Sequence, residues 1–217
     1  WLSGCNFRLA GKDWGVVFLL SLLRAVTSFS LIIAYQNIAS GVASTIHFMY
    51  PLAVSLAMMF FFHEKKSLLV MLAVLMSLFG AALLSSGELE AKSCDTIVGL
   101  VAACISVFSY GGYIIGVRTT RAAQINSTVL TCYVMGMGAV LYLIGAMATF
   151  GLHLVTDGYI WLIILGLALP ATAISNITLV RAIKYAGPTL TSILGAMEPL
   201  TAVVIGVFVF KELFTLN

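Results

Sequence analysis

Long apolar runs, separated by short polar stretches, follow one another along the whole chain. Seven of them are long enough to cross about 30 Å of hydrocarbon as α-helices. These runs cover residues 14–35, 41–62, 68–86, 96–117, 128–150, 159–180 and 189–210. The pattern predicts an all-α, polytopic membrane protein, a helical bundle whose short connections leave no room for a separate soluble domain.

The composition and the placement of charge agree with a membrane protein. Hydrophobic residues make up 61% of the chain and charged residues only 9%, whereas ordinary soluble domains carry about 25% charged residues. If the amino end is cytoplasmic, the inner connections hold eight basic residues and the outer ones only Lys92 and Lys211, which is a strong positive-inside bias. The eight are Arg8, Lys12, Lys65, Lys66, Arg118, Arg121, Arg181 and Lys184. Because they are spread over several connections, they do not indicate a nucleic-acid partner.

Other chemistry has little support in the sequence. The four cysteines form no CxxC pair and no metal-binding spacing. There is no HExxH helix and no paired acidic motif of the kind that an integral-membrane enzyme would need. We therefore expect no enzyme activity, no cofactor and no metal. A non-transporting membrane scaffold or receptor stays open as an alternative.

The chain repeats itself at an offset of 148 residues. Pro51 then lies over Pro199, and Glu64, thirteen residues later, lies over Glu212. A complete repeat of this length would contain five helices, so the second copy would enter the membrane from the opposite side. Such inverted repeats are typical of secondary transporters. We expect a first repeat at 1–90 and a second at 91–217, which together hold seven of ten transmembrane helices.

The repeated motifs resemble those of a known family. They read "YQNIASGVASTIHFMYPL" followed by "HEKKS", and "IKYAGPTLTSILGAMEPL" followed by "KELFT". This is similar to the EamA-type transporters of the drug/metabolite transporter (DMT) superfamily, over essentially all 217 residues, as helices three to nine. The resemblance implies a ten-helix permease with a central cavity between the repeats. It also implies efflux of a small metabolite or drug by alternating access, in a bacterial cytoplasmic membrane. The motifs do not indicate the substrate, and a sugar-phosphate or nucleotide-sugar carrier is a further alternative.

Polar stripes at helical spacing mark the side chains that we expect to face this cavity. The stripe in the first run, shifted by 148, falls on a matching stripe in the sixth, and Tyr50 falls on Glu198. The predicted substrate-binding residues are Arg24, Thr27, Ser28, His47, Tyr50, Tyr110, Tyr113, Thr172, Ser175, Asn176 and Glu198. His47 and the two tyrosines of the fourth run have a plain alternative, which is packing within the bundle.

Glu198 and Arg24 are the two charged residues in the middle of apolar runs. A charge at the centre of a membrane helix costs about 2.5–3.5 kcal/mol even on the lenient insertion scale. Glu198 should therefore face the interior, where it is either protonated or paired with a cation, for which Arg24 is the candidate. If Glu198 titrates, protons are the natural coupling ion. A structural ion pair, or an Arg24 that reaches toward the membrane surface, remains the alternative.

The two prolines of the repeated motif predict breaks in their helices. Proline removes the hydrogen bond to the carbonyl four residues back, and an unpaired carbonyl in the membrane is tolerated only where it lines a cavity or finds another donor. We therefore predict hinges at Pro51 and Pro199, with a static bend as the alternative reading. The expected partners are the lipid bilayer, a small-molecule solute and protons.

Overall fold

The computed structural model describes most of the chain. The described residues are 7, 9–64, 72, 75, 76, 79, 96–149, 158–195, 197, 198, 201 and 208. Within them, every regular element is helical. The third apolar run, 68–86, lies almost wholly outside the described residues, and so does most of the seventh run after Gly195.

Five helical stretches of the described part are long and apolar enough to cross a membrane. They are Trp14–Asn37, Ser40–Phe61, Thr96–Thr119, Ser127–Gly145 and Gly158–Ala186. These stretches correspond to the first, second, fourth, fifth and sixth apolar runs of the sequence. The predicted class, an all-α membrane protein with several spanning helices, is confirmed.

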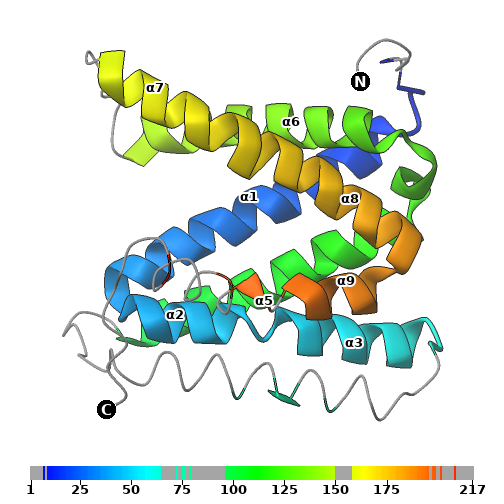
Figure 1. Ribbon diagram of the computed structural model, residues 1–217, viewed down its shortest axis with the longest axis horizontal. Helices are drawn as coiled ribbons and strands as arrows, with labels where there is room; N and C mark the ends of the chain where they lie inside the picture. Colours follow the sequence, from blue (N-terminus) through cyan, green and yellow to red (C-terminus); the bar gives the residue numbers. More distant parts are fainter. Residues whose placement is uncertain are drawn as a thin grey trace. The chain divides into compact units, whose positions relative to one another are not determined.

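The described chain divides into two compact units, and Figure 1 labels the helices of both. Unit 1 comprises Trp1–Ala25 and Gly116–Gly187. Its elements are the first part of α1 (Trp14–Asn37), the end of α5 (Thr96–Thr119), η2 (Arg121–Gln124), α6 (Ser127–Thr149), α7 (Gly158–Gly166), η3 (Leu167–Ile174) and α8 (Ser175–Ala186). In this unit α6 packs against α8. A Cβ at Gly116 of α5 would lie 2.8 Å from Leu20 of α1, so glycine allows these two helices to approach closely.

Helix α7 and the following η3 present an apolar surface on every side. Every residue from 158 to 171 is exposed, although the sequence there is almost entirely hydrophobic. In a membrane protein this surface faces lipid or further helices rather than water. The segment η3 is a π-helix with Pro170 inside it, and a proline that cannot donate a hydrogen bond favours such irregular winding.

Helix α8 continues beyond the apolar run that predicts it. The sixth run ends at residue 180, but α8 extends to Ala186 through the polar residues Arg181 and Lys184. It ends where Gly187 adopts a positive φ of 90°, a conformation that favours glycine. Pro188 then begins α9, at a position where the missing N–H costs nothing. The apolar run therefore predicted where this helix lies, whereas Gly187 and Pro188 determine where it ends.

Unit 2 comprises Val26–Ile115 and Pro188–Asn217. It holds the second part of α1, then α2 (Ser40–His47), α3 (Tyr50–Phe61), most of α5 and α9 (Pro188–Gly195). Its small-residue core is formed by Ala34, Ile38, Ala43, Ala102 and Ala103. Helix α9 packs beside α3 (Figure 1). The hydroxyl of Thr189, near the start of α9, donates a hydrogen bond of 2.5 Å to the Glu64 carboxylate just after α3.

The second membrane span is interrupted before its proline. Helix α2 ends at His47, residues Phe48 and Met49 form a turn, and α3 begins at Tyr50 (Figure 1). Pro51 is buried in the first turn of α3, where its missing N–H would have no intrahelical partner anyway. The span is thus divided just before Pro51 into two short helices joined by a turn, and the predicted hinge at Pro51 stays a prediction. Pro199 lies outside the described residues.

Candidate functional site

A charged residue and an amide meet inside unit 1. The Arg24 guanidinium on α1 donates a hydrogen bond of 3.0 Å to Oδ1 of Asn176 on α8. Asn176 is only 8% exposed, and its own Nδ2 donates to the Thr172 carbonyl at 2.7 Å. That second bond fixes the amide so that its oxygen faces the guanidinium. We call Arg24 and Asn176 the polar pair.

The irregular winding of η3 positions the polar pair. Asn176 is the second residue of α8 and directly follows the π-helix. Within that π-helix the Thr172 hydroxyl donates to the Leu167 carbonyl at 3.1 Å, so this side chain hydrogen-bonds back to the backbone of the π-helix. Tyr142 on α6 interacts electrostatically with Arg24 from a third element.

Four ring-bearing side chains gather in unit 2. We call His47, Tyr50, Tyr110 and Tyr113 the aromatic cluster. The Tyr50 ring lies 4.7 Å from that of Tyr110 in a T-shaped contact and 5.6 Å from that of His47. Tyr113 stacks 6.3 Å from Tyr110. Tyr50 is 4% and Tyr113 2% exposed, whereas His47 and Tyr110 are half-buried, so the rings form a closely packed group with a buried centre.

Hydrogen bonds define the orientation of His47 in this cluster. Its Nδ1 lies 3.0 Å from the Ser106 hydroxyl oxygen, and the Ser106 hydroxyl lies 2.6 Å from the Ala103 carbonyl. A hydroxyl has one hydrogen to donate, and a carbonyl can only accept. Ser106 therefore donates to Ala103 and accepts from His47, which places the histidine proton on Nδ1 and leaves Nε2 as an acceptor.

Gly195 of α9 leaves room for the Tyr50 hydroxyl. A Cβ built at this glycine would collide with the hydroxyl oxygen. The close packing of α3 and α9 in unit 2 depends on this missing side chain. Glu198, three residues later, lies close enough to Tyr50 for an electrostatic interaction. The Glu198 side chain itself is exposed, and its backbone carbonyl accepts a 2.8 Å hydrogen bond from the Thr201 hydroxyl.

Comparison with known families decides what kind of protein carries these groups. The model of the EamA-like transporter family matches residues 97–217, which is more than half of the 217-residue chain. The chain belongs to the EamA-like transporter family. It is therefore an integral membrane protein of the DMT superfamily, as its motifs predict. No curated protein sequence matches it.

The matched part of this EamA-like transporter contains six of the predicted site residues. They are Tyr110, Tyr113, Thr172, Ser175, Asn176 and Glu198. Arg24, Thr27, Ser28, His47 and Tyr50 precede the matched part. Of all eleven, Thr27, Tyr50, Tyr113 and Asn176 are buried, Ser175 and Glu198 are exposed, and the others are intermediate.

The structure brings eight of the eleven predicted residues of the EamA-like chain together in two groups; Thr27, Ser28 and Ser175 belong to neither group as defined above. Arg24, Thr172 and Asn176 meet in unit 1, and His47, Tyr50, Tyr110 and Tyr113 meet in unit 2, with Glu198 close enough to act on Tyr50. Each group has its own geometry. Among the described residues, no group of three His, Cys, Asp or Glu side chains could hold a metal ion.

Three residues that shape these groups are not among the predicted site residues, namely Ser106, Pro170 and Gly195. The serine belonged to the polar stripe of the fourth run, where its spacing to Tyr110 and Tyr113 could have identified it. Pro170 stands in the middle of the sixth run. The residue that matches it at the 148-residue offset is Leu22 and not a proline, so the repeat did not identify Pro170. Gly195 had no signal, because its importance depends on where the Tyr50 ring lies.

Proposed function

We propose that this EamA-like chain belongs to a secondary transporter that exports a small organic metabolite or drug by alternating access, coupled to protons. The observation that carries this proposal is the hydrogen bond between Arg24 and Asn176. A guanidinium in a membrane-spanning helix is costly, yet here it is held by an amide whose position the internal repeat singles out. Charged groups retained inside membrane helices are by default candidates for a substrate pathway.

Each group of residues by itself suggests a solute chemistry. In the proposal, the Arg24 guanidinium binds a carboxylate or phosphate of the solute, because such charge-assisted bonds are the strong ones. The aromatic cluster is by itself a second candidate site, proposed for planar or apolar solutes, since tyrosine rings offer flat faces together with a polar hydroxyl. The remaining predicted residues, Thr27, Ser28, Thr172 and Ser175, would supply further hydroxyl contacts.

Glu198 is the proposed proton-coupling group. It is a carboxyl group that follows a short turn after α9, and it lies close enough to Tyr50 of the aromatic cluster for an electrostatic interaction. In the proposal, it gains and loses a proton as the transporter alternates between its two states, while Pro51 and Pro199 serve as hinges. The proposed location is the cytoplasmic membrane of a bacterium, with export from the cytoplasm.

Transport by the full-length protein in proteoliposomes tests the proposal. A panel of metabolites and drugs is offered with and without a pH gradient, to the wild type and to Glu198→Gln. We expect the pH gradient to drive wild-type transport of at least one solute, and Glu198→Gln to lose that dependence. The control is Asp13→Asn, which removes a carboxylate that pairs with Arg121 at 3.8 Å and precedes the first span.

Two results would count against the proposal. If Glu198→Gln keeps the wild-type pH dependence, Glu198 does not couple protons. If no solute of the panel moves in either direction, the transport assignment fails as a whole.

A further inference from the structure

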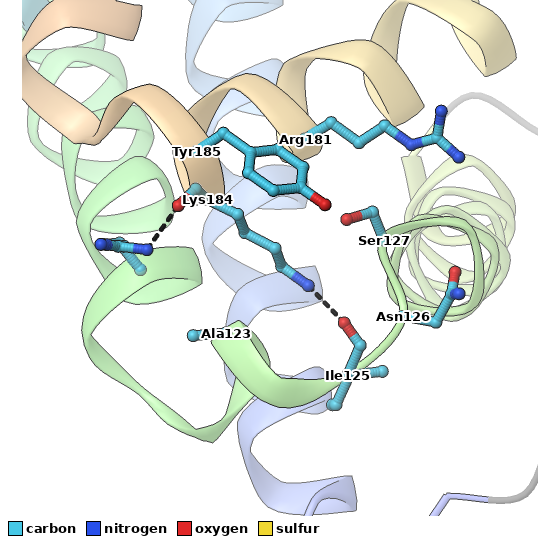
Figure 2. A pocket seen from close by; sticks show the side chains of 8 residues that line it. Ala123, Ile125, Asn126, Ser127, Arg181, Lys184 and Tyr185 are labelled. Atoms are coloured by element: carbon cyan, nitrogen blue, oxygen red, sulfur yellow. Dashed lines mark hydrogen bonds between the residues drawn. The ribbon is translucent and has the colours of Figure 1, made fainter.

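A basic pocket lies in unit 1, away from the polar pair. Its volume is about 440 Å³, within the range of small-ligand sites. Three cationic side chains line it, Arg118 from the end of α5 and Arg181 and Lys184 from α8, and none of its lining residues is acidic. Figure 2 shows Lys184 extending toward the connection between α5 and α6, while Arg181 extends away from it. All charged side chains that line the pocket are therefore positive.

Backbone carbonyls hold two of these cations in place. The Arg118 guanidinium donates to the Lys184 carbonyl, and the Lys184 ammonium donates to the Ile125 carbonyl (Figure 2). A guanidinium has five N–H donors and an ammonium three, so neither group is exhausted by a single carbonyl. The two bonds join three segments of unit 1 and orient the charges before any ligand arrives.

Neutral donors complete the lining. Asn126 and Ser127 stand at the start of α6, a helix of 23 residues whose N-terminus carries a positive partial charge. The Asn126 side chain accepts from the Thr128 N–H at 2.9 Å, which fixes this corner. The Tyr185 ring lies between Lys184 and Arg181 in Figure 2 and is 89% exposed, so its hydroxyl is accessible from outside. Cations together with a helix N-terminus are the donor set that binds phosphate groups.

The location of the pocket fits an anionic ligand at the membrane surface. The pocket is formed by the ends of α5 and α8, which Arg118 and Lys184 bring into contact. The basic residues at these two ends predict a cytoplasmic position. Anionic lipid headgroups concentrate at that surface, and basic pockets between membrane helices bind them. We propose that this pocket binds a phosphate-bearing anion, either the headgroup of an anionic phospholipid or a soluble phosphate compound.

Binding to the purified full-length protein in detergent tests the proposal. Native mass spectrometry counts bound phosphatidylglycerol or phosphatidylcholine, and the thermal unfolding midpoint is measured with each lipid and with inorganic phosphate or chloride at equal ionic strength. We expect phosphatidylglycerol or inorganic phosphate to bind and to raise the midpoint. Arg181→Gln and Lys184→Gln should each weaken that binding about fivefold, the effect of one basic residue near an anionic surface.

The matched control is Arg121→Gln. It removes the same charge from the same unit, but its side chain does not line the pocket. Lys184→Gln also removes the bond to Ile125. If that variant unfolds, Arg181→Gln, at an exposed position, tests the proposal in its place.

Binding of phosphatidylglycerol alone identifies a lipid site, and binding of inorganic phosphate identifies a site for soluble anions. The proposal is overturned if neither anion binds better than phosphatidylcholine or chloride, or if Arg121→Gln weakens binding as much as Arg181→Gln.

Discussion

The polar pair of unit 1 and the aromatic cluster of unit 2 stabilise buried polar groups in different ways. In the pair, one guanidinium and one amide are joined by a directional hydrogen bond. In the cluster, four rings pack at centroid distances of 4.7 to 6.3 Å, and the polar atoms lie at their edges. If they contact solute as proposed, the pair would discriminate by charge and the cluster by shape.

Both groups follow an irregular stretch of backbone that contains or precedes a proline. Asn176 comes directly after the π-helix around Pro170, and Tyr50 comes directly after the turn that ends before Pro51. Interrupted helices at membrane depth are tolerated where their backbone groups find other partners or line a cavity. The two groups therefore differ in side-chain chemistry, but both lie next to an interruption in a membrane helix.

Removing the charge of the pair should give the largest effect. Arg24→Ala leaves Asn176 without its guanidinium partner and deprives the proposed site of its cation. A hydrogen bond to a charged group is worth about 1.5–3 kcal/mol, so we expect uptake of anionic solutes by proteoliposomes to fall about 10- to 100-fold. Neutral solutes should be much less affected.

Arg24→Lys is the control, because it keeps the charge and loses only the planar donor geometry. Its uptake should lie between that of the wild type and that of Arg24→Ala. Equal loss for anionic and neutral solutes would mean that Arg24 supports the fold and does not select charge.

Filling the space at Gly195 should disturb the shape of the cluster. Gly195→Ala places a methyl group where the Tyr50 hydroxyl lies, and the tyrosine, 4% exposed and packed against Tyr110, has little freedom to move. Overpacking of this kind costs about 1–3 kcal/mol. The free energy of unfolding in detergent measures the cost, and Tyr50→Phe in the same chain should restore most of it.

Gly136→Ala is the matched control, since a Cβ at that helical glycine meets nothing within 4 Å apart from its chain neighbours and the backbone of its own helix. If Gly195→Ala destabilises the protein no more than Gly136→Ala does, the close approach of α9 to Tyr50 is not a constraint.

The sequence predicted the spans and many of the polar groups, because both depend on local pattern. Asn176 was identified by adding 148 to Ser28, and the structure gives it a charged partner from the first span. This partner, Arg24, lies one turn before Ser28 in the first span. The pairing depends on the π-helical winding of η3, and a pattern with a period of 3.6 residues cannot predict that winding. The end of α8 likewise required Gly187 and not the apolar run.

Long-range packing was the part that the sequence could not supply. Ser106 and His47 are 59 positions apart, and each alone reads as an ordinary polar residue on a membrane helix. The same holds for Gly195 and Tyr50. Such pairs follow only from the arrangement of whole helices, so pattern reasoning named one partner and missed the other.

The smallest expected effect concerns the hydrogen bond at the edge of the cluster. Side-chain hydrogen bonds inside membrane proteins contribute about 0.6 kcal/mol on average, so a double-mutant cycle with His47→Ala and Ser106→Ala should give a coupling free energy of about that size.

The direction of this hydrogen bond can be tested by NMR. Because Ser106 donates to Ala103, the wild-type histidine should show the ¹⁵N chemical shifts of the Nδ1–H tautomer, and Ser106→Ala should shift its population toward Nε2–H. A wild-type spectrum dominated by the Nε2–H form would mean that Ser106 donates to His47. Nε2 of His47 would then carry the proton and act as a hydrogen-bond donor.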